Sequence, residues 1–173
     1  MEGDSRMRVL VVRHAIAVLH GTPDVPEDER PLTPKGEKRF RVAAKGLARI
    51  CRRPDVLLSS PLVRARQTAD IAAGAWGKVE VTEADALAGG SFEQIATAVE
   101  KYADQKLVAI FGHEPDVSMV LARLLGSSAS ERLTFKKGGA ALLDVPGRMA
   151  DGGALVWYVP PRVLRALAGD DED

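Results

Sequence analysis

The chain has 173 residues, and its 24 Lys and Arg residues balance 24 Asp and Glu residues, so its formal net charge at pH 7 is zero. This length suits one domain with a sizeable core, and the neutral balance creates no overall field that would attract nucleic acid or an anionic membrane. Because the single Cys51 excludes an internal disulfide and no apolar run suits a membrane span or a signal peptide, we expect a soluble cytoplasmic protein.

The first predicted strand ends in two polar side chains. The apolar run "RVLVV" at residues 8–12 is typical of a strand buried on both faces, and Arg13 and His14 follow it directly. Thr33 as N-cap and Pro34 as first residue then indicate a helix. Its inner face is predicted from apolar residues at helical spacing, which are Phe40, Ala43, Ala44, Leu47 and Ile50.

A second strand-to-helix passage repeats this pattern. Residues 55–58 predict a short strand, and Ser60 and Pro61 are suited to cap and begin the helix after it. Arg64 is expected one turn into this helix, off the apolar stripe that its alanines form. A weaker strand is expected at residues 79–81.

A third passage brings a histidine to the end of a strand. A helix is predicted from Ser91, because Gln94 completes a capping-box pattern. Residues 107–111 predict the next strand, which His113 follows closely, and another helix begins after Pro115. Two more strands and a short helix are predicted toward the C-terminus, at residues 140–145, 154–159 and 161–167.

The alternation of strands and helices predicts an α/β fold, a three-layer α/β/α sandwich around a mostly parallel central sheet. We expect a flexible N-terminal extension over residues 1–7, a single domain over residues 8–168 and an acidic tail over residues 169–173. The sequence contains no internal repeat and no evident domain boundary.

Each of three predicted strands is followed by charged or histidine side chains. These side chains are Arg13, His14, Arg64 and His113. Ligands of open α/β sheets bind at the carboxyl edge of the strands, so these side chains are expected to meet there. Guanidinium groups neutralise the oxygens of a phosphoryl group. A histidine with a pKa near 6.5 keeps a neutral, nucleophilic form at neutral pH. The predicted pocket therefore suits phosphoryl chemistry.

The motifs that carry these residues resemble those of the histidine phosphatase superfamily, the phosphoglycerate mutase-like or branch 1 group. "RHA", "SSPLVRARQTA" and "GHEP" match its motifs in order and context. The small size and "ERPLTPKGE" are most similar to the SixA-type phosphohistidine phosphatases. The resemblance implies a phosphoglycerate mutase-like fold, His14 as a transiently phosphorylated nucleophile, and Arg13, Arg64 and His113 as phosphate-binding residues. It implies no metal and no other cofactor.

Two features depart from the family pattern. Ala15 stands where the family usually has glycine, so the backbone there must suit a residue with a side chain. No carboxylate is clearly in register with the general acid of related enzymes, although Asp85 and Glu83 are near in "EADALAGGS" and Glu114 is another candidate. An alkoxide leaving group needs such an acid, which contributes about 10²–10⁴-fold, whereas imidazole leaves readily. The pattern therefore favours phosphohistidine over phosphate esters.

We expect a metal-independent phosphatase that removes phosphate from phosphohistidine on proteins in signal transduction, as a monomer or weak dimer. Two alternatives are a phosphomonoesterase for a sugar phosphate or nucleotide, and a non-catalytic module that binds phosphorylated proteins. A metal site built from His14, His20 and His113 is a weaker alternative, since their spacing has no ligand signature. Arg30 is expected on the solvated surface, and "FKKGG" at residues 135–139 in an exposed turn.

Overall fold

A six-stranded sheet forms the centre of the molecule, in a computed structural model that describes residues 6–169. The strand order is β3-β2-β4-β1-β5-β6; the first four strands are parallel, and β5 runs antiparallel to both of its neighbours. The bounds are Met7–Arg13 for β1, Val56–Ser59 for β2, Val81–Glu83 for β3, Leu107–Gly112 for β4, Ala140–Val145 for β5 and Ala154–Val159 for β6. The sheet is thus mostly parallel, as predicted.

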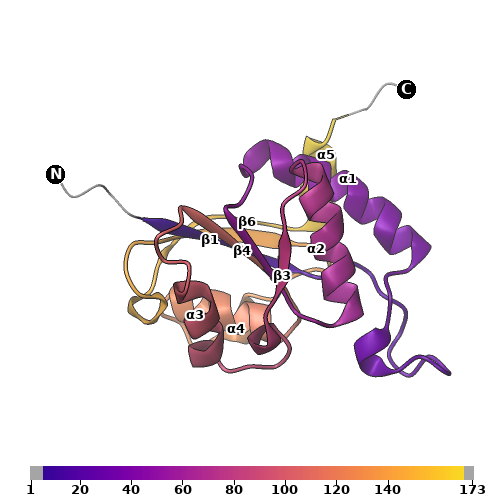
Figure 1. Cartoon of the computed structure of the whole chain (residues 1–173), viewed down its shortest axis with the longest axis horizontal. Coiled ribbons are helices and arrows are strands. Elements are labelled where there is room, and N and C mark those ends of the chain that lie inside the picture. The colour runs from indigo at the N-terminus through magenta and orange to yellow at the C-terminus, as the bar shows by residue number, and fades with distance from the viewer. Residues whose placement is uncertain (1–5, 170–173) are drawn as a thin grey trace.

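Helices cover both faces of this sheet (Figure 1). The helices α1 (Pro34–Ile50), α2 (Val63–Ala75) and α5 (Pro161–Leu167) pack on one face, and α3 (Phe92–Glu100) and α4 (Asp116–Leu124) pack on the other. Each face has its own buried apolar cluster, with Phe40 and Leu47 in the first and Ile95 and Leu121 in the second. Short 3₁₀ turns complete the chain, at Glu27–Glu29 (η1), Asp85–Leu87 (η2), Ser130–Arg132 (η3) and Met149–Asp151 (η4). The predicted three-layer sandwich is confirmed.

The capping signals read from the sequence determine where two helices begin. The Thr33 hydroxyl accepts a hydrogen bond from the Gly36 N–H at 2.9 Å, which satisfies a donor in the first turn of α1. At α3, Ser91 and Gln94 make both hydrogen bonds of a capping box. The predicted elements at residues 140–145, 154–159 and 161–167 are confirmed to the residue.

Other expectations about element ends were wrong. Leu62, not Ser60, is the N-cap of α2, because the Ser60 hydroxyl accepts a hydrogen bond from the Leu62 N–H and so makes the turn before the helix. Arg64 is therefore the second residue of α2 rather than one turn in. Met7, expected in a flexible extension, opens β1 and is 3% exposed, because it already pairs with Val145 of β5.

The third strand is also displaced from its predicted place. It lies at Val81–Glu83 instead of residues 79–81, because the pairing with β2 starts where Leu57 meets Val81. Most of the predicted extension, residues 1–5, and most of the predicted acidic tail, residues 170–173, lie outside the described residues. Within residues 6–169, no helix has the length and apolar character that a membrane crossing needs.

Candidate active site

The carboxyl ends of β1 and β4 are neighbours in the sheet, and the four predicted site residues converge there. Arg13 is the last residue of β1, His14 follows it, and His113 follows β4. Arg64 comes from the first turn of α2, after β2, which pairs with β4. All four residues line one cavity of about 390 Å³. The imidazole rings of His14 and His113 have centroids 5.2 Å apart.

The surroundings of His14 determine which of its nitrogens carries the proton. Nδ1 lies 2.6 Å from the carbonyl oxygen of Ala15, and because a carbonyl oxygen only accepts, Nδ1 must be the protonated nitrogen. Burial, with help from the positive charges of Arg64 and Arg13, lowers the pKa of His14 to about 3. At neutral pH the imidazole is therefore neutral, with its free lone pair on Nε2.

Hydrogen bonds from two sides hold the backbone of His14 and Ala15. The His14 N–H donates to the Gly112 carbonyl at 3.0 Å, and the Ala15 N–H donates to the Thr68 hydroxyl of α2 at 3.0 Å. The Thr68 hydroxyl in turn donates to the Arg64 carbonyl at 2.7 Å. Ala15 is not among the described residues with positive φ, so its methyl group requires no strained backbone. The departure from the family glycine is thus accommodated.

Three guanidinium groups line the cavity, one more than the sequence indicated. The third belongs to Arg30, which was expected on the solvated surface but whose side chain is only 14% exposed. Burial lowers the pKa of Arg13 and of Arg64, although a guanidinium stays charged at pH 7. The Nε atoms of all three arginines are buried without a hydrogen-bond acceptor among the described residues. Phosphate oxygens are acceptors of the kind that such donors favour.

Glu27, in η1, contributes an anion to this cluster of positive charge. Its Oε1 accepts a hydrogen bond from Arg30 Nη2 at 2.6 Å and lies 3.4 Å from Arg64 Nη2. Its Oε2 lies 2.5 Å from Nδ1 of His20, an exposed side chain. The hydrogen bonds from Arg30 and then His20 lower the pKa of Glu27 to about 2. The carboxylate is therefore ionised at neutral pH and contacts two of the three arginines.

His113 offers a second ring nitrogen to the cavity. Its Nε2 lies 2.7 Å from the Ser60 hydroxyl, and its Nδ1 is buried without a partner in the described part of the chain. Burial, followed by the charges of Arg64, Arg30 and Arg13, lowers the pKa of His113 to about 4. An anion bound beside the ring would oppose that shift and supply an acceptor.

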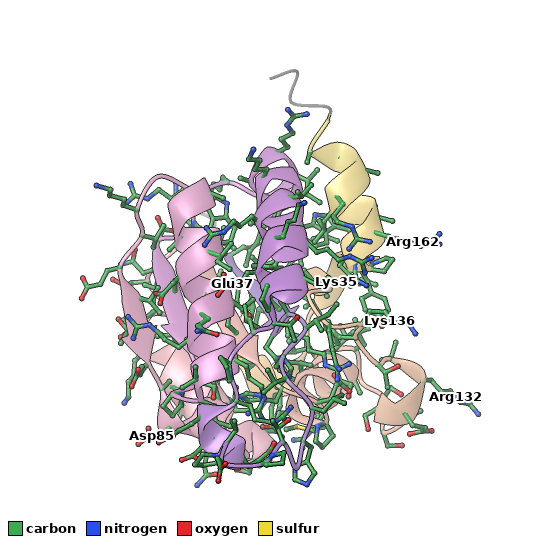
Figure 2. All side chains as sticks on the ribbon, turned by 90° about the vertical axis from the view of Figure 1, so that its right-hand side faces the viewer. Lys35, Glu37, Asp85, Arg132, Lys136 and Arg162 are labelled. Atoms are coloured by element: carbon green, nitrogen blue, oxygen red, sulfur yellow. The ribbon has the colours of Figure 1, made fainter. Side chains whose placement is uncertain are left out.

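Two of the three candidate general acids, Asp85 and Glu83, are not among the residues that line the cavity. Glu83 pairs with Arg66 at 3.2 Å, and Asp85 is exposed in η2, where Figure 2 shows it at the lower edge of the molecule. The carboxylate of Glu114 lines the cavity instead. Its Oε2 accepts a hydrogen bond from the Ser118 hydroxyl at 2.7 Å, and its Oε1 is buried without a partner among the described residues.

Sequence reasoning did not assign to the site three charged residues that line the cavity. These are Glu27, Arg30 and Lys137. Arg30 lies in "ERPLT", directly before the Thr33 cap, so its proximity to a well-defined helix start was the available signal. Glu27 and Lys137 lie in connections whose course the sequence did not reveal. Within residues 6–169, no group of three or more His, Cys, Asp or Glu side chains is arranged to hold a metal ion.

Comparison with known proteins identifies the family. A sequence profile of the histidine phosphatase superfamily (branch 1) matches residues 9–98. The chain belongs to this superfamily. An uncharacterised protein of Picosynechococcus sp. (strain PCC 7002) is 36% identical to this histidine phosphatase over 138 residues, which cover 77% of the chain and 82% of the relative.

Solved structures of SixA proteins have the same fold. A protein of Nakamurella multipartitia assigned as phosphohistidine phosphatase SixA has a TM-score of 0.74 and 28% identity, with 90% of this chain and 96% of that chain covered. A protein histidine phosphatase SixA in complex with tungstate has a TM-score of 0.78 and 22% identity, with 91% and 99% covered. The chain is thus a phosphatase of the histidine phosphatase superfamily with a SixA-like fold.

Proposed function

We propose that the chain is a metal-independent phosphatase that removes phosphate from phosphohistidine on proteins through a covalent phosphohistidine on His14. The main supporting observation is the tautomer of His14, whose Nδ1 donates to the Ala15 carbonyl and leaves the lone pair of Nε2 free. A neutral imidazole nitrogen in a cavity lined by three guanidinium groups suits attack on a phosphoryl group.

The proposed reaction has two displacements at phosphorus. In the first, His14 Nε2 forms a bond to phosphorus while the nitrogen–phosphorus bond of the substrate breaks, and the leaving imidazole takes a proton from water. In the second, a water oxygen attacks phosphorus, and the bond to His14 breaks with its electron pair returning to Nε2. Inorganic phosphate leaves with the protons of that water, one of which neutralises the hydroxide formed in the first step. Arg13, Arg30 and Arg64 neutralise the phosphoryl oxygens in both steps, and His113 contributes a hydrogen bond to one of them.

Two observations support a substrate with a nitrogen–phosphorus bond. Asp85 and Glu83, the carboxylates nearest to the family's general acid in the sequence, are not among the residues that line the cavity, and imidazole needs less help in leaving than an alkoxide. The similar protein of Nakamurella multipartitia is also assigned as a phosphohistidine phosphatase.

The test is to trap the intermediate in a single turnover. Wild type and His14→Ala are mixed with a phosphohistidine peptide, quenched in alkali and assayed for acid-labile phosphate on the protein. Wild type should carry one such phosphate per chain, and His14→Ala should carry none. Arg41→Ala is the control, because Arg41 is exposed on α1 and is not among the residues that line the cavity, so it should leave phosphoenzyme formation intact. Unchanged turnover in His14→Ala would refute the mechanism.

The position of Glu114 favours one second candidate, a phosphomonoesterase acting on a small phosphate ester. A carboxylate that lines the cavity with one buried, unpartnered oxygen is a group that can protonate an alkoxide. On this hypothesis Glu114→Gln lowers kcat on an alkyl phosphate by about 10²–10⁴-fold. On the phosphohistidine hypothesis, wild type has the higher kcat/KM on a phosphohistidine peptide and Glu114→Gln changes that value little.

A further inference from the structure

A second hollow, larger than the catalytic cavity, lies beside it. This groove has a volume of about 550 Å³ and is lined by residues of α1, of α5 and of the segment at residues 136–137. Its apolar lining side chains are Ala15, Ile16, Phe40, Ala43, Pro160 and Pro161. A volume and lining of this kind suit an organic ligand or a short stretch of polypeptide.

The polar lining of the groove is entirely basic. Its charged side chains are Arg39, Lys136, Lys137, Arg162 and Arg165, and no Asp or Glu of the described residues lines it. Figure 2 shows Lys136 and Arg162 extending from the same side of the molecule. In a chain with equal numbers of acidic and basic residues, this is a local concentration of positive charge.

These five basic side chains have no acidic partner among the described residues. Within residues 6–169, none of the five makes a hydrogen bond or ion pair with a carboxylate, whereas Arg52 pairs with Asp55 and Arg123 pairs with Glu93. Positive charges that face one groove without internal counter-charges favour an anionic partner. Within residues 6–169, no carboxylate neutralises this part of the surface.

The groove adjoins the catalytic cavity. Lys137 lines both hollows, and Ala15, which lines the groove, is the residue after His14. The intervening segment is held in place, because the Gly138 N–H donates to the carbonyls of Arg13 and His14 at 3.1 and 3.0 Å. A polypeptide with a phosphorylated side chain in the cavity therefore has neighbouring residues within reach of the groove.

We propose that this groove binds an acidic stretch of the substrate protein that adjoins the phosphorylated histidine. The inference rests on the proposed function and names the substrate class more closely. Carboxylates of that stretch meet the basic lining, and an apolar side chain among them packs against Phe40 and the two prolines. A free phosphoramidate or a small ester fills only the catalytic cavity and gains nothing from the groove.

The test compares two phosphohistidine peptides and one small substrate. The peptides differ only at the positions flanking the phosphohistidine, with Asp and Glu in one and Asn and Gln in the other, and phosphoramidate is the small substrate. The charge-reversal variant is Arg39→Glu/Arg162→Glu. The matched control is Arg41→Glu, because Arg41 is an exposed residue of the same helix as Arg39 but does not line the groove.

Wild type is expected to have about tenfold higher kcat/KM on the acidic peptide than on the peptide with Asn and Gln. A tenfold ratio corresponds to about 1.4 kcal/mol, which a few exposed charge contacts can supply. Added salt reduces this preference. Arg39→Glu/Arg162→Glu loses the preference and keeps its turnover of phosphoramidate, while Arg41→Glu keeps both. Equal kcat/KM on the two peptides in wild type, or an unchanged preference in the double variant, would overturn the proposal.

A binding measurement separates this inference from the proposed function. Fluorescence anisotropy with the labelled, unphosphorylated acidic peptide measures the groove without any turnover, so a failure of phosphoenzyme trapping leaves it unaffected. The double variant is expected to weaken binding of this peptide by about tenfold. Two results would overturn the proposal by naming another occupant. In the first, a chain truncated after Gly169 binds the peptide more tightly, which would identify residues 170–173 as the occupant. In the second, the wild-type protein is a dimer and Arg39→Glu/Arg162→Glu is a monomer, which would identify a second copy of the chain as the occupant.

Discussion

Replacing Thr68 by valine tests how the site is held together. Thr68 is fully buried in α2, where its hydroxyl accepts a hydrogen bond from the Ala15 N–H and donates one to the Arg64 carbonyl. It thereby links the backbone beside His14 to the helix that carries Arg64. Valine has nearly the same shape as threonine, so Thr68→Val removes these hydrogen bonds without opening a cavity.

The expected loss of stability follows from the buried Ala15 N–H. Its acceptor disappears in Thr68→Val, and a buried donor left without a partner costs about 1–3 kcal/mol. The Arg64 carbonyl loses less, because in a helix it still accepts from the backbone N–H four residues later. We therefore expect the free energy of unfolding to fall by about 2 kcal/mol, a substantial part of the roughly 5–15 kcal/mol typical of a domain.

The assay pairs urea unfolding with kcat/KM on phosphoramidate, using Thr68→Ser as the matched control. Serine keeps the hydroxyl and removes only a methyl group, so it should cost about 1 kcal/mol and leave kcat/KM near the wild-type value. Thr68→Val should lower kcat/KM as well, because it removes the hydrogen bond that holds the Ala15 backbone, and the Ala15 carbonyl fixes the tautomer of His14. A valine variant as stable and as active as the serine variant would refute this reasoning.

Three further changes have defined outcomes. Gly46→Ala should destabilise the protein by more than about 2 kcal/mol, because the added Cβ would lie 1.8 Å from the Leu164 carbonyl oxygen; Gly74→Ala, which meets nothing within 4 Å, should be neutral or stabilising in the same urea assay. The pKa values of about 3 for His14 and about 4 for His113 lie below those of the unfolded chain, so the unfolded state binds more protons as the pH falls below about 6.5, and stability falls with it. A variant with both histidines replaced by glutamine should lose less stability between pH 7 and pH 5, and an equal loss would contradict this assignment. Arg30→Ala should weaken tungstate binding, measured by calorimetry, by about ten- to hundredfold, whereas unchanged affinity would exclude Arg30 from the phosphate site.

The fold was predictable because its signals are local. Thr33 and Ser91 mark helix starts through hydrogen bonds within one turn, and the buried strands are short apolar runs. Ser60 misled the prediction for the opposite reason. Its hydroxyl accepts a hydrogen bond from the nearby Leu62 N–H, but it also lies 2.7 Å from Nε2 of His113, which is 53 positions away in the chain. The residues next to Ser60 in the sequence do not indicate this second contact.

The site was predictable only where strand ends carry its residues. Arg13 ends β1, and His14 and His113 directly follow β1 and β4, so the parallel sheet alone brings them together. Arg30 and Glu27 reach the cavity through a long connection, whose path depends on contacts such as the one between the Leu32 N–H and the Gln67 side chain. Contacts of that kind are set by tertiary packing and leave no periodic signal in the sequence.

The carboxylate of Glu27 has a consequence for the departure of the product. Its Oε1 already accepts from Arg30 and contacts Arg64, and one N–H group cannot serve both this carboxylate and a phosphate oxygen. An arriving phosphoryl group can accept hydrogen bonds from the free Nε–H groups, but to use the Nη2 groups of Arg30 and Arg64 it must displace the Glu27 carboxylate, which stays tethered nearby by its own backbone. When inorganic phosphate has formed, the same tethered anion competes for the arginines at high effective concentration. We therefore expect Glu27 to shorten the residence time of the product in the site.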